Sequence, residues 1–131
     1  MGVAERRQYK RMFFSIEEGP LGVFALPDMD TGVLTAIIMD LSMGGLGLSI
    51  RKGGDMSINV GDRLILTEIR GMADTNLRPI NNIETEIKWI QNYRAFRHIL
   101  FGCEFVDITQ TTRDQIQQFI NSWVEDADVR R

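Results

Sequence analysis

Hydrophobic and polar positions alternate with a period of two along most of the chain, the pattern of β-strands that bury one face. In residues 83–89, for example, Ile83, Thr85, Ile87 and Trp89 share one face, and three charged residues occupy the other. Turn signals such as Gly19-Pro20 separate these segments. The pattern predicts roughly six short strands. The strand candidates are residues 12–18, 33–41, 46–51, 62–69, 83–89 and 99–105, with residues 23–26 as a further short candidate.

The period changes near the C-terminus. Apolar residues recur there at i, i+3, i+4, i+7 and i+8, which predicts one amphipathic helix with a single apolar stripe. The stripe comprises Ile116, Phe119, Ile120, Trp123 and Val124. Thr111 is the expected N-cap, with Asp114 in the capping-box position.

The fold predicted from these elements is mainly β: a small six-stranded antiparallel β-barrel with the C-terminal helix covering an open side. Closure into a barrel removes the strand edges that an open sheet of this size would expose. Trp89 and Trp123 are expected in the core or at the seam between barrel and helix. We place the barrel and helix at residues 12–125, after a flexible basic arm at 1–11 and before a frayed tail at 126–131.

Charge is distributed unevenly between the arm and the rest of the chain. The 131 residues are enough for a single core and carry a net charge of −3. Residues 1–11 contribute four cations, Arg6, Arg7, Lys10 and Arg11, against Glu5, so the remainder carries −6. A basic arm on an acidic body suits one local anionic ligand better than a long nucleic-acid track.

The sequence argues against several classes of chemistry. One cysteine, Cys103, and one histidine, His98, form neither a disulfide nor a zinc site of the usual kind. Cys103 lies in an apolar strand face and is predicted to be inert core. We find no catalytic constellation, and we expect a binding module without metal or cofactor rather than an enzyme. Cysteine usage and the lack of a membrane-length apolar run or signal peptide predict a cytoplasmic protein without membrane insertion.

Two separated motifs describe a divided site for an anionic ligand. The first is Arg7-x-x-x-Arg11 in the arm. Two guanidinium groups there can converge on one ligand, and each has a donor fork that matches a phosphate or the O6/N7 edge of guanine. Arg6 adds a planar cation that can stack on a base. Alone, these arginines would be read as a solvated basic tail.

The second motif is Asp40-x-Ser42-x-x-Gly45, at the end of a hydrophobic strand. Asp40 accepts hydrogen bonds, as the N1–H and N2–H₂ donors of guanine require, and Ser42 offers a hydroxyl. Gly44 and Gly45 permit positive φ and close approach of a ligand to the backbone. Alone, this motif would be read as a hairpin turn whose polar side chains satisfy backbone amides.

Taken together, the two motifs resemble the signature of the PilZ domain family over about residues 6–123. Gly102-Cys103-Glu104-Phe105 is similar to the late strand of that family. The resemblance implies a receptor for cyclic di-GMP (c-di-GMP), with Arg6, Arg7, Arg11, Asp40, Ser42, Gly44 and Gly45 as ligand-binding residues. It also implies that the arm closes over the ligand and that a downstream protein partner receives the signal. In the family, an arginine at the place of Arg6 accompanies binding of a stacked ligand pair.

Two other functions remain open from the sequence. One is a PilZ-like adaptor that binds no nucleotide, for instance in type IV pilus assembly, in which Arg7 and Arg11 would be dispensable. The other is a small barrel that binds single-stranded nucleic acid through the arm, against which the acidic body argues. We expect no nucleic-acid partner. The downstream partner, the ligand stoichiometry and a homodimer are left open.

Overall fold

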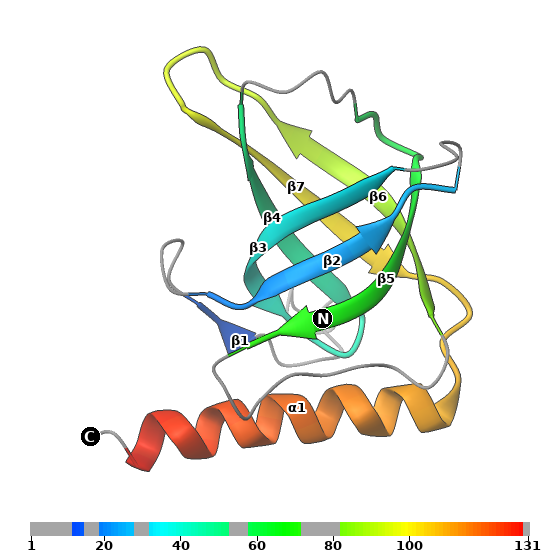
Figure 1. The fold of residues 1–131 in the computed structure, drawn as a ribbon, viewed down its shortest axis with the longest axis vertical. Coiled ribbons are helices and arrows are strands. Elements are labelled where there is room, and N and C mark those ends of the chain that lie inside the picture. Colours follow the sequence, from blue (N-terminus) through cyan, green and yellow to red (C-terminus); the bar gives the residue numbers. More distant parts are fainter. Residues whose placement is uncertain (1–11, 15–18, 28–31, 53–57, 72–81, 130–131) are drawn as a thin grey trace, which may run out of the picture.

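The computed structural model describes residues 12–14, 19–27, 32–52, 58–71 and 82–129 (Figure 1). Within α1, side chains are described as far as residue 121. The elements are β1 (Met12–Phe13), β2 (Leu21–Ala25), β3 (Val33–Leu41), β4 (Gly45–Arg51), β5 (Arg63–Arg70), β6 (Ile83–Gln91), β7 (His98–Phe105) and α1 (Gln110–Val129).

Six of the strands close into an antiparallel barrel. Neighbouring strands follow the order β3-β2-β5-β6-β7-β4, and β4 pairs back onto β3 to close the ring. The two-residue β1 lies outside this ring and pairs with the end of β3. The predicted fold, a mainly β six-stranded antiparallel barrel with a C-terminal helix, is confirmed. The strand bounds differ from those predicted by one or two residues in most cases, and residues 15–18 of the predicted first strand lie outside the described part.

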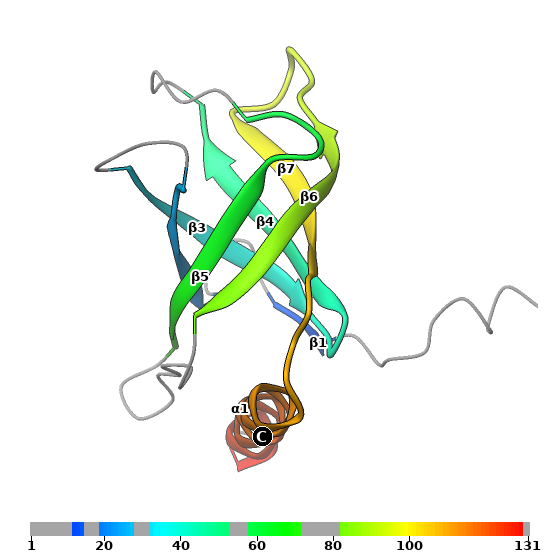
Figure 2. The same cartoon turned by 90° about the vertical axis from the view of Figure 1, so that its right-hand side faces the viewer.

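Apolar side chains from all six barrel strands fill the interior. Those fully excluded from solvent include Phe24, Ile38, Leu48, Leu64, Ile87 and Phe101. The helix α1 lies across one end of the barrel (Figures 1 and 2) and adds Ile116 and Phe119 to the same core cluster. The amphipathic stripe thus packs on the barrel as predicted for these two residues, whereas the side chain of Trp123 lies outside the described residues.

The N-terminus of α1 is capped by Thr109 rather than by Thr111. The Thr112 N–H donates to the Thr109 hydroxyl oxygen at 3.2 Å, and the Thr109 carbonyl accepts the first helical hydrogen bond, from the Arg113 N–H at 2.9 Å. Thr111 lies inside the first turn, so the predicted cap was wrong by two residues. The sequence carries threonine at 109, 111 and 112, and each could act as a cap.

A β-bulge changes the face on which Trp89 lies. Strand β6 alternates as predicted from Ile83 to Ile87, but its register against β7 shifts between Ile87 and Trp89. Lys88 and Trp89 are consequently both exposed, and the exposed fraction of Trp89 is 40%. The prediction that Trp89 belongs to the core or the helix seam was wrong, because one extra residue in a bulge resets the alternation of side chains.

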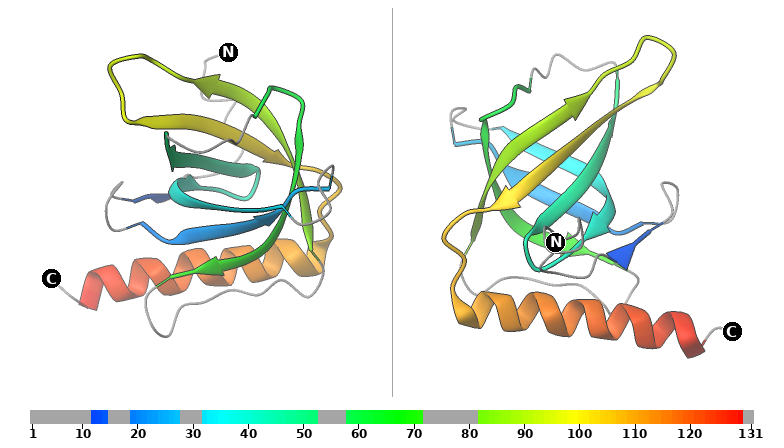
Figure 3. Two further views of the ribbon diagram at one scale, coloured as in Figure 1. Left: turned by 45° about the horizontal axis from the view of Figure 1, so that its top comes forward. Right: turned by 180° about the vertical axis from the view of Figure 1, so that it is seen from behind.

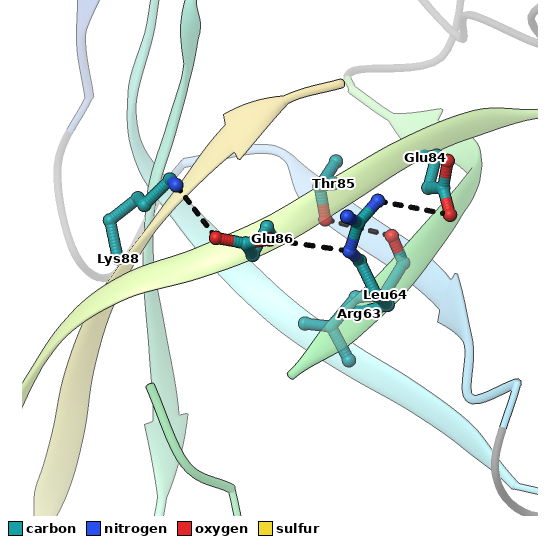
Figure 4. Close-up of polar contacts among 6 residues, drawn as sticks. All are labelled: Arg63, Leu64, Glu84, Thr85, Glu86 and Lys88. Atoms are coloured by element: carbon teal, nitrogen blue, oxygen red, sulfur yellow. Dashed lines mark hydrogen bonds and ion pairs between the residues drawn. The ribbon is translucent and has the colours of Figure 1, made fainter. Parts of the chain in front are cut away.

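Charged side chains on the outer face of β5 and β6 form a short network (Figure 4). The Arg63 guanidinium lies 3.2 Å from a Glu84 oxygen and 3.3 Å from a Glu86 oxygen, and the Lys88 ammonium donates to Glu86 at 2.6 Å. The hydrogen bond and charge of Lys88, followed by the charge of Arg63, lower the pKa of Glu86. These groups are accessible to water, so the network contributes little to stability.

Cys103 is buried, as predicted, and we expect its thiol to be unreactive in the folded chain. Burial raises its pKa from 9.0 to about 12, against a smaller opposite effect of a hydrogen bond with Thr85. A disulfide reagent near neutral pH should therefore label no thiol in the native protein and one thiol after denaturation.

The raised pKa of Cys103 also makes stability depend on pH. Between the ordinary thiol pKa and the raised one, the unfolded chain loses the thiol proton while the folded chain keeps it, so stability should fall as the pH rises through that window. The free energy of unfolding of Cys103→Ala, measured with urea, should lack this dependence on pH. Equal dependence on pH in the native and Cys103→Ala proteins would contradict a raised thiol pKa at Cys103.

Candidate functional site

Asp40 lies on the outer face of the barrel because β3 contains a bulge. The register of β3 against β4 shifts between Ile38 and Asp40. Ile38 and Leu41 are both fully buried, so the side chain of Asp40 is directed outwards. It leans over the neighbouring strand: a Cβ built on Gly47 would lie 2.4 Å from Asp40 Oδ2. A glycine at position 47 is therefore what allows the carboxylate to lie across β4.

Trp89 of β6 lies over β7 in the same way that Asp40 of β3 lies over β4. The bulge in β6 directs its indole outwards, over β7. A Cβ built on Gly102 would lie 2.0 Å from Trp89 Nε1, so only glycine leaves room for the ring. Phe101 and Cys103, on either side of Gly102, are buried in the core. Two bulges and two glycines thus place a carboxylate and an indole on one outer surface.

These four residues form a single row across the sheet. Asp40 pairs with Gly47, Gly47 with Gly102, and Gly102 with Trp89, so the row crosses β3, β4, β7 and β6. The strands β4, β7 and β6 run side by side in the right-hand view of Figure 3. Because neighbouring strands lie about 4.8 Å apart, the row is about 14 Å long when followed along the curved sheet. We call these four residues the Asp40–Trp89 row. It combines a hydrogen-bond acceptor, an aromatic ring and glycine backbone.

The turn after Asp40 is held by its own hydrogen bonds. The Ser42 hydroxyl oxygen accepts from the Gly44 N–H at 3.1 Å, and the Ser42 N–H donates to the Gly45 carbonyl at 2.9 Å. The Phe105 N–H donates to the Gly44 carbonyl at 2.9 Å, which ties the turn to the end of β7. Ser42 is 8% exposed. Its side chain therefore has a structural role in the turn, the alternative that the sequence left open.

Gly45 is required by packing rather than by an unusual backbone conformation. A Cβ at this position would lie 2.1 Å from the carbonyl oxygen of Cys103 on the adjacent strand. In the part of the chain that the structure describes, Gly61, with φ 96°, is the glycine that has a positive φ. Gly44 and Gly45 were expected to permit positive φ, but Gly45 instead serves the close approach of β4 to β7.

The arginines Arg6, Arg7 and Arg11 lie outside the described residues. The structure does fix where the chain goes directly after them. Met12 pairs with Leu41 and Phe13 with Asp40, so β1 runs beside the end of β3 that carries Asp40. Arg11 is bonded to Met12, and each residue extends the chain by at most about 3.8 Å. The chain that directly follows Arg11 therefore lies beside the end of β3 that carries Asp40.

The described ranges contain no group of three or more His, Cys, Asp or Glu side chains that could hold a metal ion. Nor does any helix there have the length and apolarity to cross a membrane.

Sequence reasoning missed Gly47, Gly102 and Trp89 as site residues. Gly47 and Gly102 each lie inside a predicted strand, and an interior glycine often marks close approach of other groups. That signal was available, although Gly102 was singled out only for its resemblance to a late strand. Trp89 was hidden by the bulge, which no pattern of period two reveals.

Comparison with known proteins places this fold among solved structures. The chain is similar to the PilZ domain of YcgR from Escherichia coli with c-di-GMP, at a TM-score of 0.71 and 18% identity over 95% of this chain and 96% of that one. The K. pneumonia MrkH–c-di-GMP complex matches at a TM-score of 0.67 and 14% identity, over 96% of this chain and 56% of that one. The Bacillus subtilis inhibitor of motility, MotI, matches at 0.65 and 20% identity, over 92% of this chain and 52% of that one.

The chain thus spans about half the length of MrkH and MotI and nearly all of the isolated YcgR domain. A search of curated proteins found no match. A family model, described as the PilZ domain, matches residues 5–122, which include both motifs and the whole barrel. The chain belongs to the PilZ domain family.

Proposed function

We propose that this protein is a cyclic di-GMP receptor and not an enzyme, with its ligand on the Asp40–Trp89 row. The observation that carries this proposal is the arrangement of the row itself. It brings Asp40 and an outward-facing Trp89 onto one surface, with Phe13 of β1 paired to Asp40. YcgR and MrkH, which share the fold, have been solved with c-di-GMP.

The chemistry of the row matches a guanine nucleotide. The Asp40 carboxylate, half-buried at one end, accepts hydrogen bonds and so suits the N1–H and N2–H₂ edge of guanine. Trp89 offers a partly exposed ring on which a base can stack, a contact worth about 1–3 kcal/mol. Between them, Gly47 and Gly102 are buried beneath the carboxylate and the ring, and the lack of a side chain at both positions lets these two groups lie across the strands.

The arginine arm supplies the positive charge that the row lacks. In this proposal Arg7 and Arg11 bind the phosphates or the O6/N7 edge of guanine bidentately, and Arg6 stacks on a base. Without ligand, four cations in the arm repel one another, and the two phosphates of cyclic di-GMP offset this repulsion. Ordering the arm costs about 1–2 kcal/mol per residue, so several charge-assisted hydrogen bonds are needed to close it.

The output in this proposal is the closed arm. Ligand binding would order residues 1–11 over the row and present a new surface to a downstream protein. Control of motility, adhesion or exopolysaccharide is the proposed pathway. The B. subtilis relative with this fold is an inhibitor of motility.

Calorimetric titration of Gly47→Ala tests the position of the ligand. The added methyl displaces the Asp40 carboxylate, which is the end of a rotatable side chain, and leaves the backbone in place. Because a hydrogen-bonded carboxylate contributes about 1.5–3 kcal/mol, binding of cyclic di-GMP should weaken at least about tenfold. Thr35→Ala, exposed on the same strand as Asp40, is the control and should bind like the native chain. Unchanged affinity in a folded Gly47→Ala protein would move the ligand away from the row.

A further inference from the structure

The hairpin that joins β6 to β7 is a projection at the end of the barrel remote from α1 (Figures 1 and 2). All six of its residues, 92–97, have exposed side chains. Tyr93 and Phe96 are 53% and 48% exposed and pack edge to face, with ring centroids 5.4 Å apart. The Phe96 N–H donates to the Tyr93 carbonyl at 3.1 Å, which fixes the turn between them. The two rings therefore form a preformed, exposed aromatic pair that takes no part in the core.

Four cationic residues lie in this hairpin or at the adjacent end of β4. Arg94 and Arg97 belong to the hairpin, and Arg51 ends β4 opposite His98 at the start of β7. The Lys52 N–H donates to the Arg97 carbonyl at 2.8 Å, and its ammonium group donates to the Tyr93 carbonyl. Residues 45–52 and 89–101 contain no Asp or Glu, although the chain has a net charge of −3 and its other residues therefore carry −7. We call Arg51, Lys52, Tyr93, Arg94, Phe96 and Arg97 the hairpin tip.

We propose that the hairpin tip is a peripheral contact site for anionic phospholipid bilayers. A convex projection that carries aromatic rings together with cationic residues matches the interface of such a bilayer. The rings enter the headgroup region while Arg and Lys meet the lipid phosphates. With the tip on the bilayer, α1 lies at the end of the barrel that faces away from the negative surface (Figure 1).

An anionic protein surface and a nucleic acid both fit this tip less well than a bilayer does. A stable protein–protein contact needs about 800 Å² from each partner, which is more than a six-residue turn with two neighbouring cations presents. An elongated nucleic acid would run along β6 and β7 past Glu86 and Glu104, which are cross-strand neighbours and repel phosphates. A bilayer touches the end of the hairpin alone. The proposal does not rest on nucleotide binding, and its test contains no nucleotide.

The test is co-sedimentation of the full chain with vesicles of phosphatidylglycerol and phosphatidylethanolamine, compared with phosphatidylcholine vesicles. The native chain should bind the anionic vesicles selectively. Tyr93→Ser with Phe96→Ser should bind them at least about tenfold more weakly, because both rings that enter the interface are removed. The matched control is Val33→Ser with Val60→Ser, two isolated valines that are each 62% exposed. This control should bind like the native chain.

The contribution of charge is tested by one pair of double variants, and the insertion of the ring into the bilayer is tested by a tryptophan substitution. Arg94→Gln with Arg97→Gln should bind at least about tenfold more weakly, whereas Arg63→Gln with Arg70→Gln, which removes equal charge from exposed ion pairs, should bind normally. Phe96→Trp should show blue-shifted emission that brominated lipids quench. Absence of native binding to anionic vesicles at low salt, equal binding by tip and control variants, or tip-dependent binding to polyglutamate or DNA in preference to vesicles would each overturn the proposal.

Discussion

Gly45→Ala is expected to lower the free energy of unfolding by about 3 kcal/mol, the largest effect that a single added methyl should have in this barrel. The new Cβ would lie 2.1 Å from the Cys103 carbonyl oxygen and 3.0 Å from the Glu104 Cα. Both are backbone atoms of β7, so no side-chain rotation relieves the overlap and the two strands must separate. Urea unfolding measures the change, and the melting temperature should fall by roughly ten degrees.

Gly47→Ala is the matched control for this effect, since it makes the same substitution two residues further along β4. Its Cβ would meet the Asp40 carboxylate, which can rotate away. The change in unfolding free energy should therefore stay within about 1 kcal/mol. Equal destabilisation by the two variants would show that β4 does not approach β7 as closely as the structure has it.

Arg7→Ala with Arg11→Ala is expected to weaken cyclic di-GMP binding at least about a hundredfold. Each guanidinium is proposed to donate charge-assisted hydrogen bonds, at about 1.5–3 kcal/mol apiece, so loss of two should exceed the effect of any single row residue. Titration calorimetry measures the affinity, and its stoichiometry distinguishes one bound ligand from a stacked pair and thereby tests Arg6.

The control for the arm is Arg130→Ala with Arg131→Ala, which removes two arginines at the opposite end of the chain. This variant should bind as the native chain does. If both double variants bind equally well, the arm does not hold the ligand. If neither they nor the native chain bind cyclic di-GMP, the nucleotide-free adaptor becomes the better account of this PilZ domain.

Patterning was sufficient to predict the barrel because its strands bury one face each. The segment 83–87 alternates without ambiguity, and the change of period before Ile116 separates the helix from the strands. The Asp40 motif was visible because a carboxylate at the end of an apolar strand is unusual.

The rest of the site depends on features that local sequence does not encode. The two bulges, at Asp40 and at Trp89, follow from how β3, β4, β6 and β7 register against one another in the closed barrel. Each bulge decides whether one side chain faces the core or the solvent. The meaning of Gly47 and Gly102 likewise depends on a side chain from a neighbouring strand, and so becomes clear only once those strands are paired.

The most direct test of the receptor account is a titration of isotope-labelled protein with cyclic di-GMP, followed residue by residue with NMR. The account predicts large shifts at the Gly47 and Gly102 amides and at the Trp89 indole N–H. The amide of Thr109, at the helix cap, should stay unchanged. Saturable shifts confined to the row would establish it as the binding surface. Absence of shifts at the ligand concentration that saturates calorimetry, or shifts that leave the row unaffected, would contradict the account.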